Sequence, residues 1–289
     1  MIIGHRPLTD PVIQDEIFKL LKIITPESVD LNIWDSKNYF NSFRNWITSS
    51  SKNTVYGFDD FQHNAYCAGT YDGIQSFIHR HVTTRRIRFS RAEFVGSKII
   101  SNNAQAKWCY LEDDALDKND ALVLSLPFSG NGNCYSGHDS ILKECSNLNI
   151  PVLIDLAYFG ISSGLNIDLS HKCISDVVCS LSKPMIAQFR LGLRLTRDYH
   201  DDQIQSLSDS KTYNRIAVII AINLLNKFSH DWIVDRYLPK QQKICKHFNI
   251  TPTQTLTLAL GDSTNYPNYF RSGYYRICIT DELLQDIYN

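Results

Sequence analysis

Four short apolar segments constrain the fold of this 289-residue chain more than any other feature of its sequence. Each has the length of one buried strand, and polar stretches with helical spacing separate them, as at residues 136–149. A strand that is apolar along its whole length is covered on both faces, and helical connections between such strands favour parallel pairing. We therefore predict a three-layer α/β/α fold in which helices enclose a mostly parallel sheet. The predicted strands cover residues 121–128, 150–158, 174–182 and 190–196.

The length of the chain suits one large α/β domain or two modest domains. We expect a large domain over residues 45–209 and a smaller α+β domain that combines residues 1–44 with residues 210–289. Helices are predicted before the first strand and after the last one, and two strand-like segments follow them. The predicted helices cover residues 13–24, 70–82, 213–228 and 232–248, and the later strands cover residues 254–260 and 274–279.

Charge and cysteine content disfavour several classes of protein. The sequence has 29 Lys and Arg against 30 Asp and Glu, a net charge of −1, whereas nucleic-acid-binding proteins are usually basic. A basic cluster at residues 79–88 fits a solvated helix C-terminus. Eight cysteines without a C-x-x-C pair fit free thiols in a reducing compartment. The longest apolar run, residues 216–222, is far below the roughly 20 residues of a membrane span. We expect a soluble, cytoplasmic protein without nucleic-acid or membrane partners.

Polar side chains follow three of the predicted strands at the points where these strands end. In parallel sheets, ligands bind beyond the carboxyl ends of the strands. We therefore expect these side chains to converge on one crevice. They are Ser129 and Asn131 after the first strand, Asp155 and Tyr158 after the second, and Ser180, Ser182 and Lys183 after the third.

Lys183 is the first candidate for chemistry in this crevice. Most lysines are solvated surface charges, but a partly desolvated lysine has a lowered pKa and a nucleophilic amine, which suits Schiff-base formation. Asp155 either caps the following helix or holds a heterocyclic nitrogen protonated, as pyridoxal phosphate requires. Tyr158 either packs in the core or hydrogen-bonds the phenolic oxygen of that cofactor.

A phosphate group needs hydrogen-bond donors and positive charge. Gly69 and Thr70 begin a predicted helix, whose N-terminal N–H groups favour an anion. Ser180 and Ser182 offer hydroxyl groups, and the guanidinium of Arg190 can bind two oxygens. Each serine alone is equally well explained as an ordinary residue at a strand end.

Six short motifs occur in order between about residue 55 and the C-terminus. They are Gly69-Thr70, LPFSGNGN, DLAY, SLSK, RLG and YYRICI. Together they resemble the motifs of fold-type-I pyridoxal-phosphate enzymes, in particular the aspartate aminotransferase superfamily. LPFSGNGN is similar to a variant of N-P-x-G, DLAY to D-x-x-Y, SLSK to S-x-S-K and RLG to R-x-G.

The resemblance implies a pyridoxal-phosphate-dependent transferase fold and pyridoxal 5'-phosphate as the cofactor. Lys183 would form the Schiff base and then shuttle a proton, while Asp155 would pair with the ring nitrogen and Tyr158 with the phenolic oxygen. Arg276, within YYRICI, would bind the carboxylate of an amino-acid substrate. The other implied cofactor contacts are Gly69, Thr70, Ser180, Ser182 and Arg190 at the phosphate, Phe94 on the ring face, and Ser129 or Asn131 at the ring oxygen.

The resemblance also implies a homodimer, because active sites of this family usually lie at a dimer interface. Tyr56 would then contact the phosphate of the neighbouring subunit, although a core position is the other interpretation of this tyrosine. Lys183 and Arg190 are seven residues apart (190 − 183), one fewer than is usual in the family. Arg194 is therefore an alternative phosphate ligand.

The activity implied by the resemblance is that of an aminotransferase acting on an amino acid and a 2-keto acid. The same cofactor site serves lyases, decarboxylases and aldolases, and a non-catalytic relative that uses the fold for binding is a further alternative. A hydrolase with Cys134 as nucleophile and His138 as base is a third hypothesis, and its alternative is two unrelated residues in a loop. His171 and Cys173 lack two further ligands at metal spacing, so no metal site is predicted.

Overall fold

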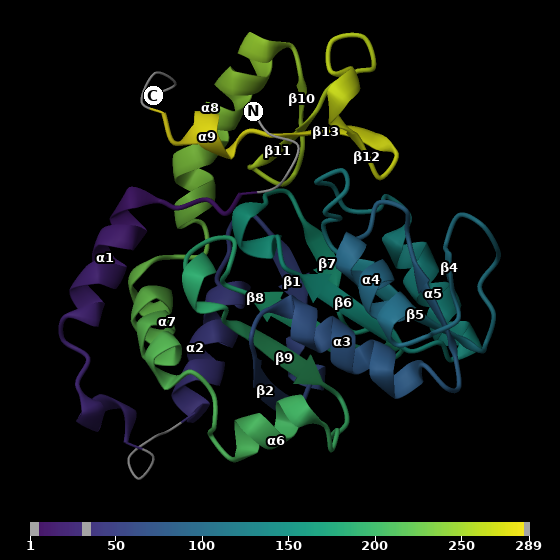
Figure 1. The fold of residues 1–289 in the computed structure, drawn as a ribbon, viewed down its shortest axis with the longest axis horizontal. Helices are drawn as coiled ribbons and strands as arrows, with labels where there is room; N and C mark the ends of the chain where they lie inside the picture. The colour runs from purple at the N-terminus through teal and green to yellow at the C-terminus, as the bar shows by residue number, and fades with distance from the viewer. Residues whose placement is uncertain (1–5, 31–35, 286–289) are drawn as a thin grey trace.

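A seven-stranded sheet forms the centre of the molecule in the computed structural model, which describes residues 6–30 and 36–285 (Figure 1). The strand order is β2-β9-β8-β6-β5-β3-β4. The strands from β8 to β4 pair in parallel, whereas β9 runs antiparallel to both β8 and β2. The sheet is therefore mostly parallel, as predicted, and it contains all four predicted strands. The strands are β2 (His63–Cys67), β3 (Arg86–Phe89), β4 (Trp108–Tyr110), β5 (Asp120–Ser125), β6 (Val152–Leu156), β8 (Ile174–Ser180) and β9 (Gly192–Thr196).

Both faces of this sheet are covered by helices. Val123 and Leu124 are neighbours on β5 and are fully buried on opposite faces: Val123 belongs to the same buried cluster as Ile74 of α3, and Leu124 to the same cluster as Leu142 of α5. This arrangement confirms the three-layer α/β/α fold. The helices of these layers are α2 (Ser36–Thr48), α3 (Thr70–His81), α4 (Val95–Asn103), α5 (His138–Leu148), α6 (Gln203–Asp209) and α7 (Arg215–Lys227).

Local sequence determines where α1 (Pro11–Leu21) begins. Asp10 Oδ1 accepts hydrogen bonds from the backbone N–H groups of Val12 at 2.9 Å and Ile13 at 3.1 Å. Pro11 occupies the first helical position, where a missing N–H costs nothing. The helix packs on α7, which in turn packs on α2. Tyr39 of α2 then reaches the large sheet, where its hydroxyl donates to the carbonyl oxygen of Gly192 at 2.7 Å.

The C-terminal elements form a separate small sheet with the order β10-β11-β13-β12, which lies above the large sheet in Figure 1. The strand predicted over residues 254–260 is shorter than expected. The side-chain amide of Gln241 donates to the carbonyl oxygens of Thr253, Thr255 and Leu258, so the chain wraps around this amide before it pairs as a strand. These elements are α8 (Trp232–Phe248), β10 (Thr251–Pro252), β11 (Leu258–Leu260), β12 (Phe270–Arg271), β13 (Tyr274–Cys278) and α9 (Thr280–Leu283).

The predicted division at residues 45 and 210 stays a prediction. Helix α2 crosses the first of these positions, and one buried cluster includes Leu8, sheet residues such as Ile154, and Leu283. The remaining short elements connect the layers. They are the parallel pair β1 (Thr54–Tyr56) and β7 (Asn166–Asp168), and the 3₁₀ helices η1 (Pro26–Val29), η2 (Phe58–Asp60), η3 (Phe159–Ile161), η4 (Ala187–Phe189) and η5 (Pro267–Tyr269).

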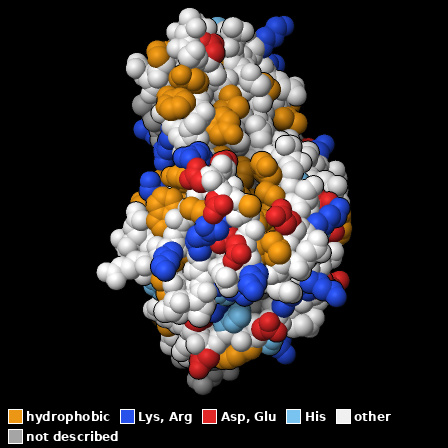
Figure 2. All heavy atoms as spheres, turned by 90° about the vertical axis from the view of Figure 1, so that its right-hand side faces the viewer, with side chains coloured by type: hydrophobic (Ala, Val, Ile, Leu, Met, Phe, Trp, Pro, Cys, Tyr) orange, Lys and Arg blue, Asp and Glu red, His pale blue; other side chains and the backbone are white. Residues whose placement is uncertain are grey.

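The face shown in Figure 2 carries Lys and Arg side chains interspersed with Asp and Glu, together with scattered apolar side chains. This distribution matches the near-neutral net charge of the sequence. Among the residues that the structure describes, no helix is both long enough and apolar enough to cross a membrane.

Candidate active site

A cavity lies beyond the carboxyl ends of β5, β6 and β8, where the polar strand ends were expected to converge. Three segments outside these strand ends also reach it: the start of α3, the loop before α4 and the loop before β9. The structure therefore brings most of the predicted site residues together. The cavity is lined by Thr70, Tyr71, Phe94, Ser125, Ser129, Asp155, Ala157, Tyr158, Ser180, Ser182, Lys183 and Arg190.

Lys183 lies just after β8, with its Nζ 5.3 Å from the ring centroid of Tyr158. Burial lowers the pKa of Lys183, and the positive charges of Arg190 and Arg276 lower it further, while Asp155 acts in the opposite direction. A lysine in these surroundings has a larger neutral fraction than a surface lysine. Its amine is therefore a better nucleophile.

Asp155 ends β6 and is only 3% exposed. Its Oδ1 accepts a hydrogen bond from the Ala157 N–H at 2.8 Å, and its Oδ2 accepts one from Ser125 Oγ at 3.3 Å. Burial raises the pKa of Asp155 to about 6, against the opposing effect of hydrogen bonds that include one from Thr70. The carboxyl group is therefore mostly charged at neutral pH, and it is placed to stabilise a protonated nitrogen.

Gly69, at the start of α3, and Arg190 form a cradle for an anion. Gly69 has a φ of +96°, and a Cβ on this residue would lie 3.0 Å from Arg190 Nη2, so the backbone and the guanidinium are adjacent. Ser182 Oγ is buried and, among the described residues, has no hydrogen-bond partner. Ser180 Oγ is already engaged, because it donates to Leu191 O and accepts from Ser182 N. The helix start, the guanidinium and the Ser182 hydroxyl together suit a phosphate group.

Arg276 lies on β13, next to this cavity but not among its lining residues. It is 3% exposed, and its Nη1 donates to the carbonyl oxygen of Ser129 at 2.6 Å. Burial lowers the pKa of Arg276, while nearby Tyr158 raises it. The guanidinium is thus a fixed positive charge beside Ser129 and Tyr158.

Solved structures with this fold include enzymes bound to pyridoxal phosphate. The chain matches a pyridoxal-phosphate-bound C–S lyase from Staphylococcus hominis with a TM-score of 0.71 and 13% identity, over 97% of this chain and 88% of the other. An aminotransferase from Staphylococcus aureus matches with a TM-score of 0.65 and 14% identity, over 97% and 89%. A tyrosine aminotransferase from Leishmania infantum matches with a TM-score of 0.67 and 13% identity, over 95% and 88%.

The chain has the fold of type-I pyridoxal-phosphate enzymes. A scan against models of protein families finds no match. A search of curated proteins finds no match either. The comparison of structures therefore identifies a fold that sequence similarity alone does not.

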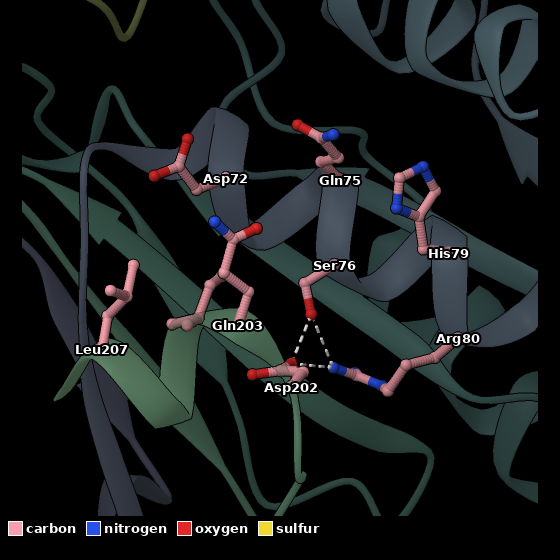
Figure 3. Close-up of a pocket in the computed structure, with 9 residues that line it drawn as sticks. Asp72, Gln75, Ser76, His79, Arg80, Asp202, Gln203 and Leu207 are labelled. Carbon is pink, nitrogen blue, oxygen red and sulfur yellow. Dashed lines mark hydrogen bonds and ion pairs between the residues drawn. The ribbon is translucent and has the colours of Figure 1, made fainter. Parts of the chain in front are cut away.

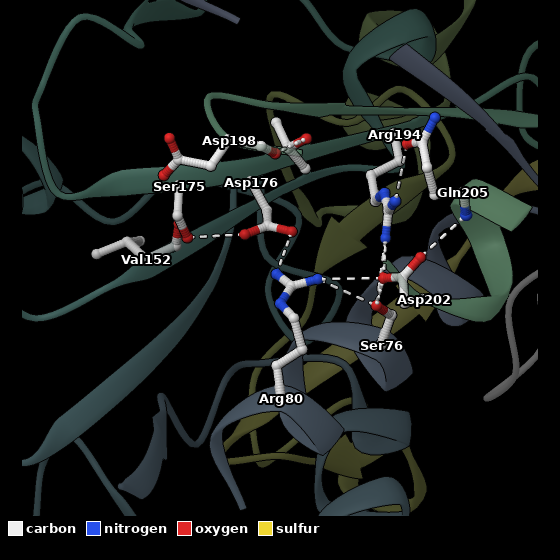
Figure 4. A network of polar contacts seen from close by, with 10 residues as sticks. Ser76, Arg80, Val152, Ser175, Asp176, Arg194, Asp198, Asp202 and Gln205 are labelled. Carbon is white, nitrogen blue, oxygen red and sulfur yellow. Dashed lines mark hydrogen bonds and ion pairs between the residues drawn. The ribbon is translucent and has the colours of Figure 1, made fainter. Parts of the chain in front are cut away.

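Within this type-I fold, Arg194 does not line the cavity that contains Lys183, whereas Arg190 does. Arg194 Nη1 is paired with Asp202 and lies 3.3 Å from Ser76 Oγ (Figure 4). Position along the chain explains the difference, because Arg190 precedes β9 near the carboxyl end of β8, whereas Arg194 lies inside β9 opposite Val178.

Asn131 and Tyr56, which were also predicted to contact the cofactor, do not line the cavity that contains Lys183. Asn131 Oδ1 accepts a hydrogen bond from the Asn133 N–H at 2.9 Å, which holds it within its own loop. Tyr56 is 48% exposed on β1, so it is not a core residue, and its contact with a neighbouring subunit stays a prediction.

The sequence analysis missed Tyr71, Ser125 and Glu93. Tyr71 and Phe94 form an edge-to-face ring pair at the cavity, with centroids 6.3 Å apart. Ser125 ends β5 and pairs in register with Asp155, so its position at a strand end was the available signal. Glu93 is buried behind Ser125, and nothing in its local sequence pointed to that contact.

The Cys134 hydrolase hypothesis does not agree with the structure. Burial raises the pKa of Cys134 to about 12, and no hydrogen bond joins it to His138 among the described residues. His138 Nδ1 instead lies 2.6 Å from the carbonyl oxygen of Tyr135. A buried thiol of high pKa without a base beside it is a poor nucleophile.

A wider cavity lies between α3 and α6 (Figure 3). Two of its charged groups, Arg80 and Asp202, are paired with each other, and Asp202 also accepts a hydrogen bond from Ser76 Oγ. Within residues 6–30 and 36–285, no group of three or more His, Cys, Asp or Glu side chains is arranged to hold a metal ion. The cavity with Lys183 is therefore the better candidate for an active site.

Proposed function

We propose that this chain is a pyridoxal-phosphate-dependent aminotransferase that moves an amino group between an amino acid and a 2-keto acid through Lys183. One observation carries the proposal: Lys183, the buried Asp155, Ser182 and Arg190 share one cavity at the carboxyl ends of parallel strands, and Gly69 lies against the guanidinium of Arg190. The cofactor-bound enzymes of the same fold support it.

The residues of the cavity fit pyridoxal phosphate. When bound, this cofactor supplies an aldehyde and a ring that takes up electrons from the substrate. Lys183 would hold the cofactor through its amine and would move a proton at the Cα atom of the substrate. Asp155 would hold the ring nitrogen protonated, and Tyr158 would hydrogen-bond the phenolic oxygen. The contacts proposed for the other cofactor groups are Gly69, Thr70, Ser180, Ser182 and Arg190 at the phosphate, Phe94 on the ring face and Ser129 at the phenolic oxygen.

Arg276 is the proposed site for the carboxylate of the amino-acid substrate. Its guanidinium is already fixed by Ser129 O, so a carboxylate entering beside Lys183 meets an ordered, charged donor. Fixing the carboxylate orients the Cα atom over the amine that must remove its proton.

A C–S lyase is the second candidate, because the solved structures of this fold include a C–S lyase and a β-cystathionase. The residues around Lys183 serve both reactions, since both begin with proton removal from Cα. The two candidates differ in products: a lyase releases a thiol or sulfide, ammonia and a keto acid from one substrate, whereas an aminotransferase needs an amino acceptor.

A homodimer and a cytoplasmic location complete the proposal. The family resemblance of the motifs supports the homodimer, with Tyr56 as a contact to the phosphate of the neighbouring subunit. The free cysteines fit a reducing compartment. Sedimentation of the purified protein, with and without the cofactor, tests the dimer.

The absorption spectrum of the protein supplied with pyridoxal phosphate tests the proposed function. We expect a visible band in the wild type and in Lys143→Ala, an exposed lysine on α5, and no such band in Lys183→Ala. An amino acid should then convert the band, and a 2-keto acid should restore it. Release of sulfide without an acceptor would favour the lyase, and no band in the wild type would reject both candidates.

A further inference from the structure

Two buried carboxyl groups lie on either side of one hydroxyl in the wall of the proposed cofactor site. Glu93 Oε1 is hydrogen-bonded to Ser125 Oγ, and Ser125 Oγ lies 3.3 Å from Asp155 Oδ2. Glu93 is 4% exposed and Asp155 is 3% exposed. The three residues come from the loop before α4 and from the ends of β5 and β6.

Among the described residues, the charged group that acts on Asp155 is the cation of Lys183, whereas the charged group that acts on Glu93 is Asp155. The pKa of Asp155 is lowered by Lys183, by the Ala157 N–H and by Thr70 of α3. Glu93 accepts hydrogen bonds from the N–H groups of Phe94 and Ser125, each at 2.7 Å, and its acidic neighbour is Asp155. In the described part of the chain, Glu93 forms no salt bridge with a Lys, Arg or His side chain. An ionised Glu93 would therefore be a buried charge without a counter-charge.

The hydroxyl of Ser125 has one hydrogen and can donate to one carboxylate at a time. If both groups were ionised, a lone pair of Ser125 would face one of the two anions. If Glu93 carries a proton, it donates to Ser125 Oγ, and Ser125 donates to Asp155 Oδ2. Lys183 favours this direction over the reverse one, because it stabilises a negative charge on Asp155 rather than on Glu93.

We propose that Glu93 is a positioning residue that holds the one proton of this pair and, through Ser125, keeps Asp155 charged and fixed toward the cofactor. The inference rests on the proposed function, because Asp155 is assigned there to the ring nitrogen. The pKa of Glu93 is the higher of the two, which agrees with a proton on Glu93. Burial and, to a smaller degree, the charge of Asp155 raise the pKa of Glu93 to about 7. Burial raises the pKa of Asp155 to about 6.

Infrared difference spectroscopy of the cofactor-free protein tests where the proton lies. We expect the wild type at pH 7, where Asp155 is mostly ionised, to show the carbonyl stretch of a protonated carboxyl group that is lost in Glu93→Gln. Glu112→Gln is the matched control, because Glu112 binds Ser90 Oγ on the same loop without touching Asp155. A signal that persists in Glu93→Gln would place the proton elsewhere and overturn the proposal.

A pH titration of the visible band tests the effect on the cofactor. The charged or titratable groups near this proton are Asp155 and Lys183, with Arg190 and Arg276 next to the lysine. Ionisation of Glu93 in the wild type adds negative charge that favours the protonated form of the bound cofactor. We therefore expect the midpoint to fall in Glu93→Gln by about 0.5 pH unit or more, and to stay unchanged in Glu112→Gln.

A third variant tests the link itself. Ser125→Ala keeps both carboxyl groups but removes a donor to Asp155, so the dissociation constant for pyridoxal phosphate should rise about fivefold to tenfold. Glu93→Gln keeps a donor toward Ser125, and the constant should stay within about threefold of the wild type. A dissociation constant in Ser125→Ala equal to that of the wild type would overturn the positioning role. If the wild type binds no cofactor, the proposed function is rejected. The infrared signal would still show which carboxyl group carries the proton.

Discussion

The guanidinium of Arg190 lies directly against the backbone of Gly69, so close that a Cβ on Gly69 would come within 3.0 Å of Arg190 Nη2. The two residues are far apart in sequence, and neither neighbourhood alone specifies an anion site. Their contact joins a helix start to a fixed positive charge at the mouth of a cavity. The proposed phosphate site is therefore a property of two segments together.

Replacing Gly69 with alanine should weaken cofactor binding. An alanine at this position must keep the backbone φ of +96°, and its Cβ must displace Arg190. We therefore expect the dissociation constant for pyridoxal phosphate to rise tenfold or more, about 1.4 kcal/mol. Gly164→Ala is the matched control, because Gly164 has a φ of +73° with open space around it. Fluorescence titration of both variants measures the constants. Equal weakening in the two variants would contradict the contact with Arg190.

Arg190 and Arg194 should differ in what their loss affects. Arg190 is an exposed side chain at the cavity, so Arg190→Ala should reduce cofactor affinity about tenfold or more and leave the unfolding midpoint nearly unchanged. Arg194 is buried and paired with Asp202, so Arg194→Ala should lower the unfolding free energy by about 3 kcal/mol. Thermal unfolding and cofactor titration, run on both variants, separate the two roles. The reverse pattern would assign the phosphate to Arg194.

Removing the Ser182 hydroxyl should have opposite effects on stability and on binding. Ser182 Oγ is buried without a partner in the part of the chain that the structure describes, so Ser182→Ala should leave the cofactor-free protein as stable as the wild type or more stable. Affinity for pyridoxal phosphate should fall about fivefold to tenfold. Ser97→Ala removes another unpartnered buried hydroxyl, on α4, and should leave affinity unchanged. Unchanged affinity in Ser182→Ala would remove this residue from the phosphate site.

The contribution of Asp155 and Glu93 to the unfolding free energy of the cofactor-free protein should fall as the pH rises from about 4 to 7. Burial raises the pKa of Asp155 from 3.8 to about 6 and that of Glu93 from 4.5 to about 7. The folded state therefore binds these protons more tightly than the unfolded state, and the stability they contribute below pH 4 is lost as the pH rises through the folded pKa values.

Urea unfolding of the wild type and of Glu93→Gln at several pH values measures this effect. The wild type should lose about 1–3 kcal/mol from Glu93 across this range, and the slope should be shallower in Glu93→Gln. Burial lowers the pKa values of His81, His200 and His230, and these residues act in the opposite direction across this window. They are present in both proteins, so the difference between the two slopes reports Glu93. Identical slopes in the two proteins would show that Glu93 keeps an ordinary pKa.

Much of the fold followed from local patterns in the sequence. Apolar runs such as residues 121–128 and 150–158 are buried strands because no other arrangement covers both of their faces. The polar residues that end them then meet at one edge of the sheet, which is why Asp155 and Lys183 could be named as neighbours before the structure was known. The strand predicted over residues 254–260 is shorter than expected, because the side-chain amide of Gln241 hydrogen-bonds the carbonyl oxygens of Thr253 and Thr255 before the strand begins.

The sequence by itself determined the order of strands and helices, the polar strand ends and the lysine among them, because these depend on periodicities of a few residues. Only the tertiary structure decided that Arg190 rather than Arg194 reaches the cavity, since Arg190 precedes β9 beside the carboxyl end of β8, whereas Arg194 lies inside β9 and is paired with Asp202. It alone also brought Glu93 to Ser125 and Asp155. The pKa values of these groups depend on burial and on contacts between segments that are distant in sequence, and a local sequence pattern specifies neither.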